Sequence, residues 1–350
     1  MRMKFLRFLL FPFSLIYGLI VALRNFAYDS GFFKSSKFSL PIINIGNLSM
    51  GGTGKTPHTE YLIRLLQDKF KVATLSRGFG RKEYGFKIAD ENSTALSIGD
   101  EPLQYFKKFG DKISVAVEAN RVHGVMDLCR EIPEINLILL DDAFQHRSIY
   151  AGLNILITAY DAPFYKDFIL PVGTLREFKN GKKRADIIIV SKCPEFNLVD
   201  KKKIVNSINP SKSQTVFFSK IQYGSVLSFN GQPKLENLSG HQVILVTGIA
   251  NPDSLKQYVS LNNEIVHHFN FNDHHKFSQS DLTEIHNLFD KFASPDTILL
   301  TTEKDAMRLI YKEFEAELKK YPWYYQAIEI ATDEKEKFDK LILDYAEKHN

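Results

Sequence analysis

The 350-residue sequence is poor in the residues that mark disulfide-rich, metal-cluster and nucleic-acid-binding proteins. It contains two cysteines, Cys129 and Cys193, both within apolar stretches, so it has neither a disulfide framework nor a cysteine metal cluster. We expect both thiols to be reduced in a cytosolic compartment. Because the net charge is only +4, the composition does not indicate a nucleic-acid partner, and we expect none.

Long uncharged runs are also scarce, apart from Phe8–Leu23, FLLFPFSLIYGLIVAL. This run is shorter than the roughly 20 residues that span a bilayer core, Pro12 interrupts it, and no small-x-small cleavage site follows it. We therefore expect an uncleaved helix that lies in or dips into a membrane, although a buried helix of a soluble core has the same composition. Its basic flanks would contact anionic headgroups, and they comprise Arg2, Lys4 and Arg7 before the run and Arg24, Lys34 and Lys37 after it.

The stretch Ile42–Pro57, IINIGNLSMGGTGKTP, has the pattern of a strand, a glycine-rich loop and the start of a helix. In this context Gly-Lys-Thr indicates a phosphate-binding P-loop, whose backbone N–H groups and helix N-terminus hold phosphate oxygens. The alternative is a glycine-rich turn that binds no nucleotide. The predicted ATP-binding residues are Ser49, Met50, Gly51, Gly52, Thr53, Gly54, Lys55 and Thr56.

Two of these residues have individual roles in the prediction. Lys55 would reach the β- and γ-phosphates, and the Thr56 hydroxyl would bind Mg²⁺. Ser49 departs from the usual pattern, because a glycine is expected there.

A second phosphate-related pattern is the apolar run Asn136–Leu140 followed by two aspartates, which resembles a Walker B strand. We assign Asp141 to the magnesium ion and keep Asp142 as a second ligand or a base. Two adjacent carboxylates at a strand end are costly without a cation, which favours this functional interpretation.

Further polar residues follow predicted strands, at the sheet edge where ligands bind in α/β proteins. The candidates for substrate contact are Arg77, Arg121, His146, Arg147, Arg176 and Glu177. Asp100 begins a helix through Phe109, where it serves either as an N-cap or in catalysis. In Asp273-His274-His275 a catalytic histidine is favoured over a metal ligand, because adjacent histidines do not readily bind one ion.

The length predicts two domains. In residues 211–238 the sequence pattern changes to that of short strands with alternating polar residues, which indicates a linker or β-ribbon. We therefore expect an apolar N-terminal helix (1–37), a P-loop kinase domain (38–210), the linker (211–238) and a C-terminal α/β domain (239–350).

Taken together and in order, these motifs resemble the tetraacyldisaccharide 4′-kinase family, the lipid A 4′-kinases of Gram-negative bacteria. Ser49 fits the family, whose loop also lacks the first glycine, whereas Ala143 replaces a more usual glycine. The motifs that carry the resemblance are residues 49–57, 77–78, 99–102, 140–146, 173–177, 273–275 and 302–305.

The resemblance implies an α/β fold: a mostly parallel P-loop NTPase-like sheet domain and a smaller α/β/α domain, joined by a two-stranded linker. ATP and Mg²⁺ would serve to phosphorylate the 4′-hydroxyl of a tetraacyl disaccharide 1-phosphate, giving lipid IVA. Asp100 would be the base, paired with His274 or less favourably His275. The enzyme would work at the cytoplasmic face of the inner membrane, without an obligate protein partner.

Two rival functions remain at this stage. A regulatory P-loop NTPase that switches a protein partner explains the P-loop and Asp141-Asp142 equally well, but not Asp100 and His274. A non-catalytic membrane-surface protein with a vestigial loop is the other.

Overall fold

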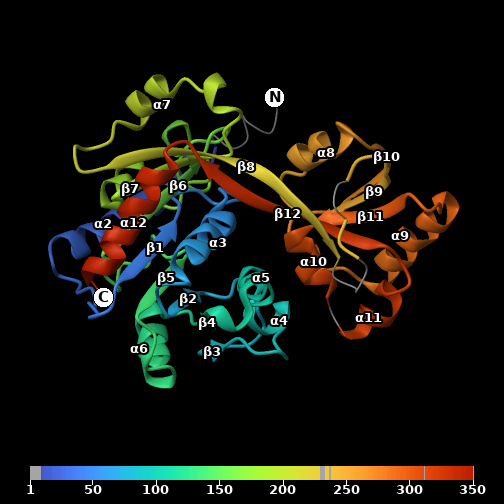
Figure 1. Cartoon of the computed structure of the whole chain (residues 1–350). Coiled ribbons are helices and arrows are strands. Elements are labelled where there is room, and N and C mark those ends of the chain that lie inside the picture. Colours follow the sequence, from blue (N-terminus) through green and yellow to red (C-terminus); the bar gives the residue numbers. More distant parts are fainter. Residues whose placement is uncertain (1–8, 229–232, 236–237, 311, 350) are drawn as a thin grey trace.

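The computed structural model describes residues 9–228, 233–235, 238–310 and 312–349. Arg2, Lys4, Arg7 and parts of the predicted linker therefore lie outside the described residues. Twelve strands form one sheet in the spatial order β10-β9-β11-β12-β8-β7-β6-β1-β5-β2-β4-β3 (Figure 1).

The strands are β1 (Ile42–Gly46), β2 (Val72–Ser76), β3 (Lys87–Ile88), β4 (Ser114–Val117), β5 (Leu137–Asp141), β6 (Leu153–Ala159), β7 (Ile187–Ser191), β8 (Thr215–Ser228), β9 (Gln242–Thr247), β10 (Glu264–Asn270), β11 (Thr297–Thr302) and β12 (Trp323–Thr332). The α-helices are α2 (Phe11–Asp29), α3 (Lys55–Leu66), α4 (Ala95–Ile98), α5 (Asp100–Phe109), α6 (Arg121–Glu131), α7 (Lys201–Ile208), α8 (Asp253–Ser260), α9 (Gln279–Phe292), α10 (Glu303–Leu309), α11 (Lys312–Leu318) and α12 (Lys335–His349).

The N-terminal half of the sheet is parallel from β7 through β6, β1, β5 and β2 to β4. Ile43 of β1 lies opposite Leu139 of β5 on one side and Leu153 of β6 on the other. Parallel strands place their carboxyl ends at one edge of the sheet. The loop after β1 and Asp141 at the end of β5 therefore lie at the same edge.

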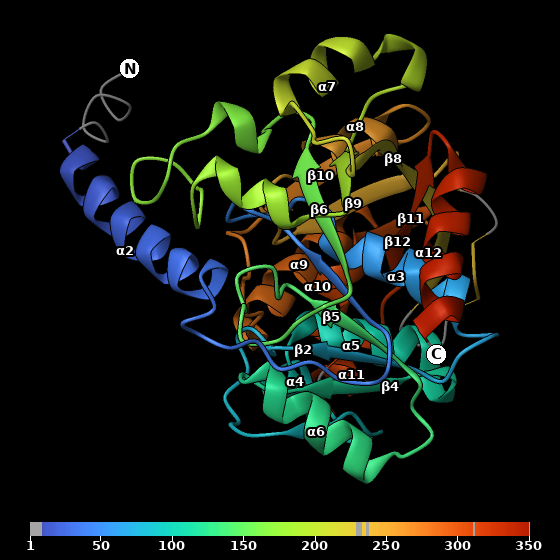
Figure 2. The ribbon, with the colours of Figure 1, turned by 90° about the vertical axis from the view of Figure 1, so that its left-hand side faces the viewer.

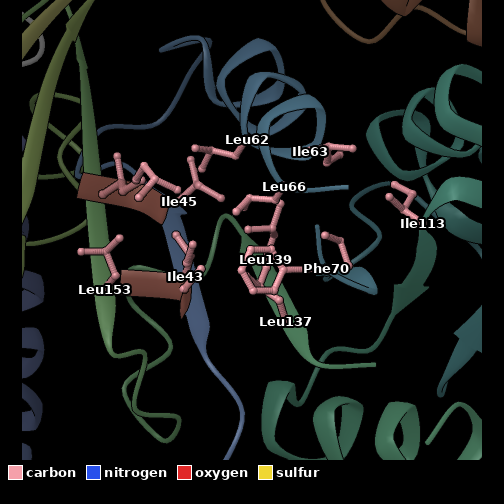
Figure 3. Close-up of a cluster of buried hydrophobic side chains, with 14 of the residues drawn as sticks. Ile43, Ile45, Leu62, Ile63, Leu66, Phe70, Ile113, Leu137, Leu139 and Leu153 are labelled. Atoms are coloured by element: carbon pink, nitrogen blue, oxygen red, sulfur yellow. The ribbon is translucent and has the colours of Figure 1, made fainter. Parts of the chain in front are cut away.

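The apolar side chains of α3 hold this helix on the sheet. Leu62, Ile63 and Leu66 are buried against Ile43 and Leu139 in the largest hydrophobic cluster (Figure 3). Burial of each such side chain contributes about 1.5–3 kcal/mol. This packing fixes the start of α3, and with it Lys55 and Thr56, above the end of β1.

Two long strands connect the two halves of the molecule. Residues 215–218 of β8 pair in parallel with β7, whereas residues 219–228 pair antiparallel with β12. Strand β12 then pairs with β11 of the C-terminal half. The sequence predicted short strands between 211 and 238, but β8 is one strand of 14 residues. The domain boundaries stay a prediction, because a single sheet runs through both halves.

Sequence analysis missed the C-terminal elements β10, α9 and α11. Strand β10 has no clean alternation of apolar and polar residues, because it is only partly buried at the edge of the sheet. Helix α9 begins with a capping box of Ser278 and Asp281, a signal that the sequence offers just after the Asp-His-His motif.

Helix α2 stands at the side of the molecule (Figure 2) and extends further along the chain than the predicted run. Among the described residues it is the one helix whose length and composition would allow it to cross a membrane. Only Ser14 and Gly18 are buried, which does not fit the alternative of a helix within a soluble core. Its exposed apolar side chains are Phe11, Phe13, Leu15, Ile16, Leu19, Ile20, Leu23 and Phe26.

Candidate active site

The P-loop is held in shape by bonds from within and from β7. Asn47 donates to the Thr53 hydroxyl at 2.9 Å, and the Ser191 hydroxyl donates to the Thr53 carbonyl at 2.6 Å. Gly54 precedes α3 with φ +89°, a conformation that a side chain disfavours. These contacts fix the loop around the start of α3, where the sequence predicts that phosphate binds.

The outer side of the loop pairs with the segment that contains Arg176. Met50 donates its backbone N–H to Thr174, and Arg176 donates its own to Leu48, at 2.8 and 2.7 Å. Ser49 and Leu175 form the bridge between them. This short antiparallel contact places the Arg176 side chain beside the P-loop.

Asp142 is paired with Lys55 and Arg176, which the sequence predicted to contact ATP and substrate respectively. Arg176 donates to both of its carboxylate oxygens, at 2.8 and 3.0 Å, and the Lys55 ammonium lies 3.6 Å away. Burial alone would raise the pKa of Asp142, but Lys55 and Arg176 outweigh it and hold the pKa below its usual value. Its left-handed backbone (φ +50°) turns the chain sharply after β5.

Asp141 is buried and behaves differently from its neighbour. Tyr105 of α5 donates to one carboxylate oxygen at 3.0 Å, while the other, Oδ1, is buried without a partner. Burial, followed by the charge of Asp142, raises the pKa of Asp141 to about 6. A buried carboxylate oxygen that lacks a partner fits a hard cation such as Mg²⁺. The half-buried Thr56 hydroxyl is the other predicted ligand.

Arg121 and His146 form a second layer behind these carboxylates. The Arg121 guanidinium is buried and donates to the carbonyls of Glu118 and Ala119, both at 3.0 Å. Burial lowers the pKa of His146 to about 4, and its ring accepts the Arg121 backbone N–H at 3.3 Å. Arg77 is exposed, and no hydrogen bond or ion pair involves its side chain among the residues that the structure describes.

Two predicted substrate residues contact α2. Arg147 donates to the Asn25 carbonyl and the Asp29 carboxylate, both at 2.7 Å. Glu177 is buried, bonded to Arg184 at 2.6 Å and to Asn25 at 2.9 Å. These contacts attach the apolar helix to the loop beside the P-loop, and the substrate-binding role of both residues stays a prediction.

The N-cap alternative for Asp100 is wrong. Gly99 occupies the N-cap position of α5, and Asp100 is the first helical residue without a capping bond. A side chain at Gly99 would press on the Phe79 carbonyl at 3.0 Å, so glycine here allows close contact between the loop after β2 and the start of α5.

The side chain of Asp100 instead meets the C-terminal half of the molecule. Arg308 of α10 donates to its Oδ2 at 2.7 Å, and Nδ1 of His274 lies 3.4 Å from the same atom. Burial opposes ionisation, but the contacts with His274 and Arg308 lower the pKa of Asp100 below its usual value. The structure thus places Asp100 beside His274. The adjacent His275 bonds Asp281 at 3.0 Å, and Asp273 is exposed.

Arg308 and Tyr105 were not singled out from the sequence. Arg308 lies three residues after Asp305, a spacing that favours an ion pair on one helix face, and the two are 2.8 Å apart. Tyr105 lies on the same helix as Asp100 but reaches Asp141.

The comparisons with known proteins identify the family. A family model described as tetraacyldisaccharide-1-P 4′-kinase matches residues 6–347. The chain belongs to this family. It is therefore a kinase of lipid A biosynthesis, as the resemblance in the sequence predicted, and the regulatory-switch alternative is not favoured.

Relatives named tetraacyldisaccharide 4′-kinase match almost the full length of this family member. The protein of Flavobacterium johnsoniae is 44% identical over 98% of both chains. That of Bacteroides thetaiotaomicron is 42% identical over 96% of this chain and 92% of its own.

A solved structure confirms the predicted fold class. The crystal structure of LpxK from Aquifex aeolicus in complex with ATP matches with a TM-score of 0.77 at 28% identity. It covers 97% of this chain and 99% of that one.

Proposed function

We propose that this kinase transfers the γ-phosphoryl group of ATP to the 4′-hydroxyl of a tetraacyl disaccharide 1-phosphate, with Asp100 as the base. The observation that carries the proposal is the contact of Asp100 with His274 and Arg308. An ionised carboxylate is thereby held beside an imidazole at the junction of the two halves. A base of this kind is what the attack of a sugar hydroxyl requires.

The nucleotide would lie over the P-loop, with its phosphates on the backbone N–H groups at the start of α3. Lys55, now paired with Asp142, would move to the γ-phosphate, which carries more charge. Thr56 and Asp141 are the residues that would hold Mg²⁺, whose charge would neutralise the phosphates when bound. Arg176 donates to Asp142 and would contact the transferred group.

In the reaction, the 4′-oxygen of the sugar forms a bond to the γ-phosphorus as the bond between that phosphorus and the β,γ-bridging oxygen breaks. The hydroxyl proton passes to Asp100, and ADP leaves with the electron pair of the broken bond. Asp100 suits this step because its Oδ2 accepts from Arg308, while Oδ1 makes no hydrogen bond to the residues that the structure describes. Positioning and charge neutralisation supply most of the catalysis.

The lipid substrate would approach from the side of α2. The exposed apolar face of this helix suits the hydrocarbon of a bilayer, and Arg147 and Glu177 attach it to the segments beside the P-loop. Because ATP is cytosolic, the enzyme would act at the cytoplasmic face of the inner membrane. Exposed Arg77 is a candidate for the 1-phosphate of the lipid.

The experiment that tests the proposal measures transfer from γ-labelled ATP to tetraacyl disaccharide 1-phosphate in detergent micelles. We expect label in the lipid with wild type and none with Lys55→Ala. Asp100→Asn should retain ATP binding and lose about a hundredfold or more in kcat. Free phosphate without labelled lipid would overturn the assigned acceptor, and wild-type turnover by Asp100→Asn would overturn the assigned base.

A further inference from the structure

The Arg308 guanidinium joins both members of the Asp100–His274 pair. Nε donates to Asp100 Oδ2 at 2.7 Å, and Nη2 lies 3.0 Å from His274 Nδ1. The remaining nitrogen, Nη1, donates to the Gly248 carbonyl at 2.9 Å and to Asp305 at 2.8 Å. All three guanidinium nitrogens are thus in use, and the side chain is only 4% exposed.

Asp305 keeps this arginine in one orientation. Its carboxylate is fully buried and also accepts bonds from the Gly248 N–H at 2.9 Å and from the Thr302 hydroxyl at 2.7 Å. Thr302 in turn caps α10, the helix that carries Arg308. A guanidinium with a fixed plane and several bonds is pre-organised in a way that a lysine ammonium is not.

The contact with Arg308 determines which nitrogen of His274 carries a proton. Arginine has no acceptor, so Nδ1 at 3.0 Å must accept from Nη2 through its lone pair. The proton of a neutral ring is then on Nε2. A neutral imidazole has one lone pair, so Nε2 cannot also accept from the Lys304 ammonium. The Lys304 contact is 3.4 Å and the Arg308 contact is 3.0 Å, and the shorter contact decides the assignment.

The same contact alters how the pair works. With Nδ1 accepting from Arg308, Nδ1 has no hydrogen to donate to Asp100 Oδ2 across the 3.4 Å between them, so in this tautomer the lowered pKa of Asp100 comes from Arg308. Asp100 is therefore paired with the arginine, and the imidazole presents Nε2–H as a donor. Phe79 packs against the His274 ring in a T-shaped arrangement, with centroids 5.4 Å apart.

We propose that Arg308 is a positioning residue that keeps Asp100 ionised and fixes His274 as the tautomer with its proton on Nε2. The inference rests on the proposed function for its effect on turnover, but the tautomer can be tested without turnover. The charged groups that face the pair are Arg308 and Lys304, both on α10, and Lys304 is also paired with Glu101 at 2.8 Å.

The kinetic test compares Arg308→Met and Arg308→Lys with wild type. In Arg308→Met we expect kcat to fall about tenfold or more, while the dissociation constant for ATP stays within about twofold. The acid limb of the pH profile of kcat should move up by about one pH unit, because Asp100 loses its cation. Arg308→Lys should restore part of kcat and of the pH shift. Arg130→Met removes an exposed arginine far from this cluster and serves as the matched control.

Because removal of Arg308 leaves Asp305 buried without its cation, Arg308→Met can fail to fold. The double variant Arg308→Met/Asp305→Asn removes the guanidinium and that carboxylate together, so the inference can still be tested. A wild-type pH profile and kcat in any folded variant that lacks the arginine would overturn the inference.

Nitrogen-15 NMR of labelled histidine gives the readout that is independent of catalysis, with His274→Gln to assign the signal. We expect Nδ1 of His274 to be unprotonated in wild type and the tautomers to mix in the variant that lacks the arginine. Protonated Nδ1 in wild type would overturn the inference while leaving the base assignment intact. Conversely, full turnover by Asp100→Asn with the expected tautomer would overturn the proposed base alone.

Discussion

Tyr105 donates its hydroxyl hydrogen bond to the buried carboxylate of Asp141 at 3.0 Å. Helix α5, which carries Tyr105, begins at Asp100. One helix therefore contacts the predicted magnesium carboxylate and also carries the proposed base. Asp100 and Tyr105 are five residues apart on α5. This helix therefore sets the distance between the proposed base and the carboxylate that Tyr105 contacts.

We predict that Tyr105→Phe weakens the use of magnesium without unfolding the protein. The phenylalanine fills the same space, but Asp141 loses the one hydrogen bond that its side chain makes among the described residues, at a cost of about 1 kcal/mol. The Mg²⁺ concentration that gives half-maximal kcat should rise several-fold, as measured by titration at saturating ATP. Tyr84→Phe, at a 97% exposed position, is the matched control. An unchanged Mg²⁺ requirement would separate Asp141 from the metal.

A second connection across the molecule is the lysine between two buried carboxylates. Lys108 of α5 lies 2.7 Å from Glu60 of α3 and 2.8 Å from Glu303 of α10. Burial, then the charge of Glu60, raises the pKa of Glu303 to about 7. Lys108 is therefore the cation that these two carboxylates share, and Arg64 lies further from Glu60, at 3.7 Å.

We predict that Lys108→Met lowers the free energy of unfolding by about 3–5 kcal/mol, because Glu303 loses its ion-pair partner and Glu60 keeps the more distant Arg64, 3.7 Å away. Adding Glu60→Gln and Glu303→Gln should recover most of this loss, since the cluster is then neutral. Urea denaturation of the single and triple variants measures both effects. If the triple variant were no more stable than Lys108→Met, packing rather than charge would explain the cluster.

Sequence reasoning found the parts of the site that are local in the chain. The P-loop and Asp141 follow strands directly, and a strand followed by a glycine-rich loop fixes where its polar residues lie. Asp100 and Arg308 are separated by 208 residues, and no spacing rule connects them. Their contact depends on how β8 and β12 align the two halves, which is a property of the whole sheet.

Charged residues next to motifs were harder to interpret, because a sequence gives the chemistry of a side chain and not its partner. Arg147 follows His146 immediately, yet its guanidinium lies over the aromatic ring of Tyr28 on α2, 5.2 Å from the ring centroid. The sequence around an arginine does not tell whether its side chain attaches a helix or binds phosphate.

The buried histidine of α3 gives a prediction for acid stability. His58 lies between the Gly54 carbonyl at 2.7 Å and the Ser219 hydroxyl at 2.9 Å, and burial lowers its pKa to about 4. Between the pKa of an unfolded histidine and this value, the unfolded chain binds a proton that the folded protein does not. The free energy of unfolding should therefore fall by up to about 3 kcal/mol as the pH decreases from about 7 to 4.

Substitution should isolate this contribution. His58→Asn keeps a donor for the Gly54 carbonyl and removes the titration, so the pH slope of stability should be smaller than in wild type. His123→Asn, at an exposed position, should leave the slope unchanged. Chemical denaturation at several pH values provides the comparison, and equal slopes in wild type and His58→Asn would assign the acid sensitivity to other groups.

The outward face of α2 gives the last prediction, which concerns the membrane. Ile16 and Ile20 are 59% and 60% exposed, whereas Tyr17 between them points inward and donates to the Arg176 carbonyl at 2.9 Å. Replacing both isoleucines by glutamate therefore spares the contact with the active-site segment. If this face lies in a bilayer, losing two buried isoleucines weakens partitioning into anionic vesicles by about a hundredfold.

Turnover in detergent micelles tests whether the active-site segment is intact. Leu198→Glu, at a 69% exposed position outside α2, is the control for added charge. Undiminished sedimentation of the double variant with vesicles would show that another surface binds the membrane.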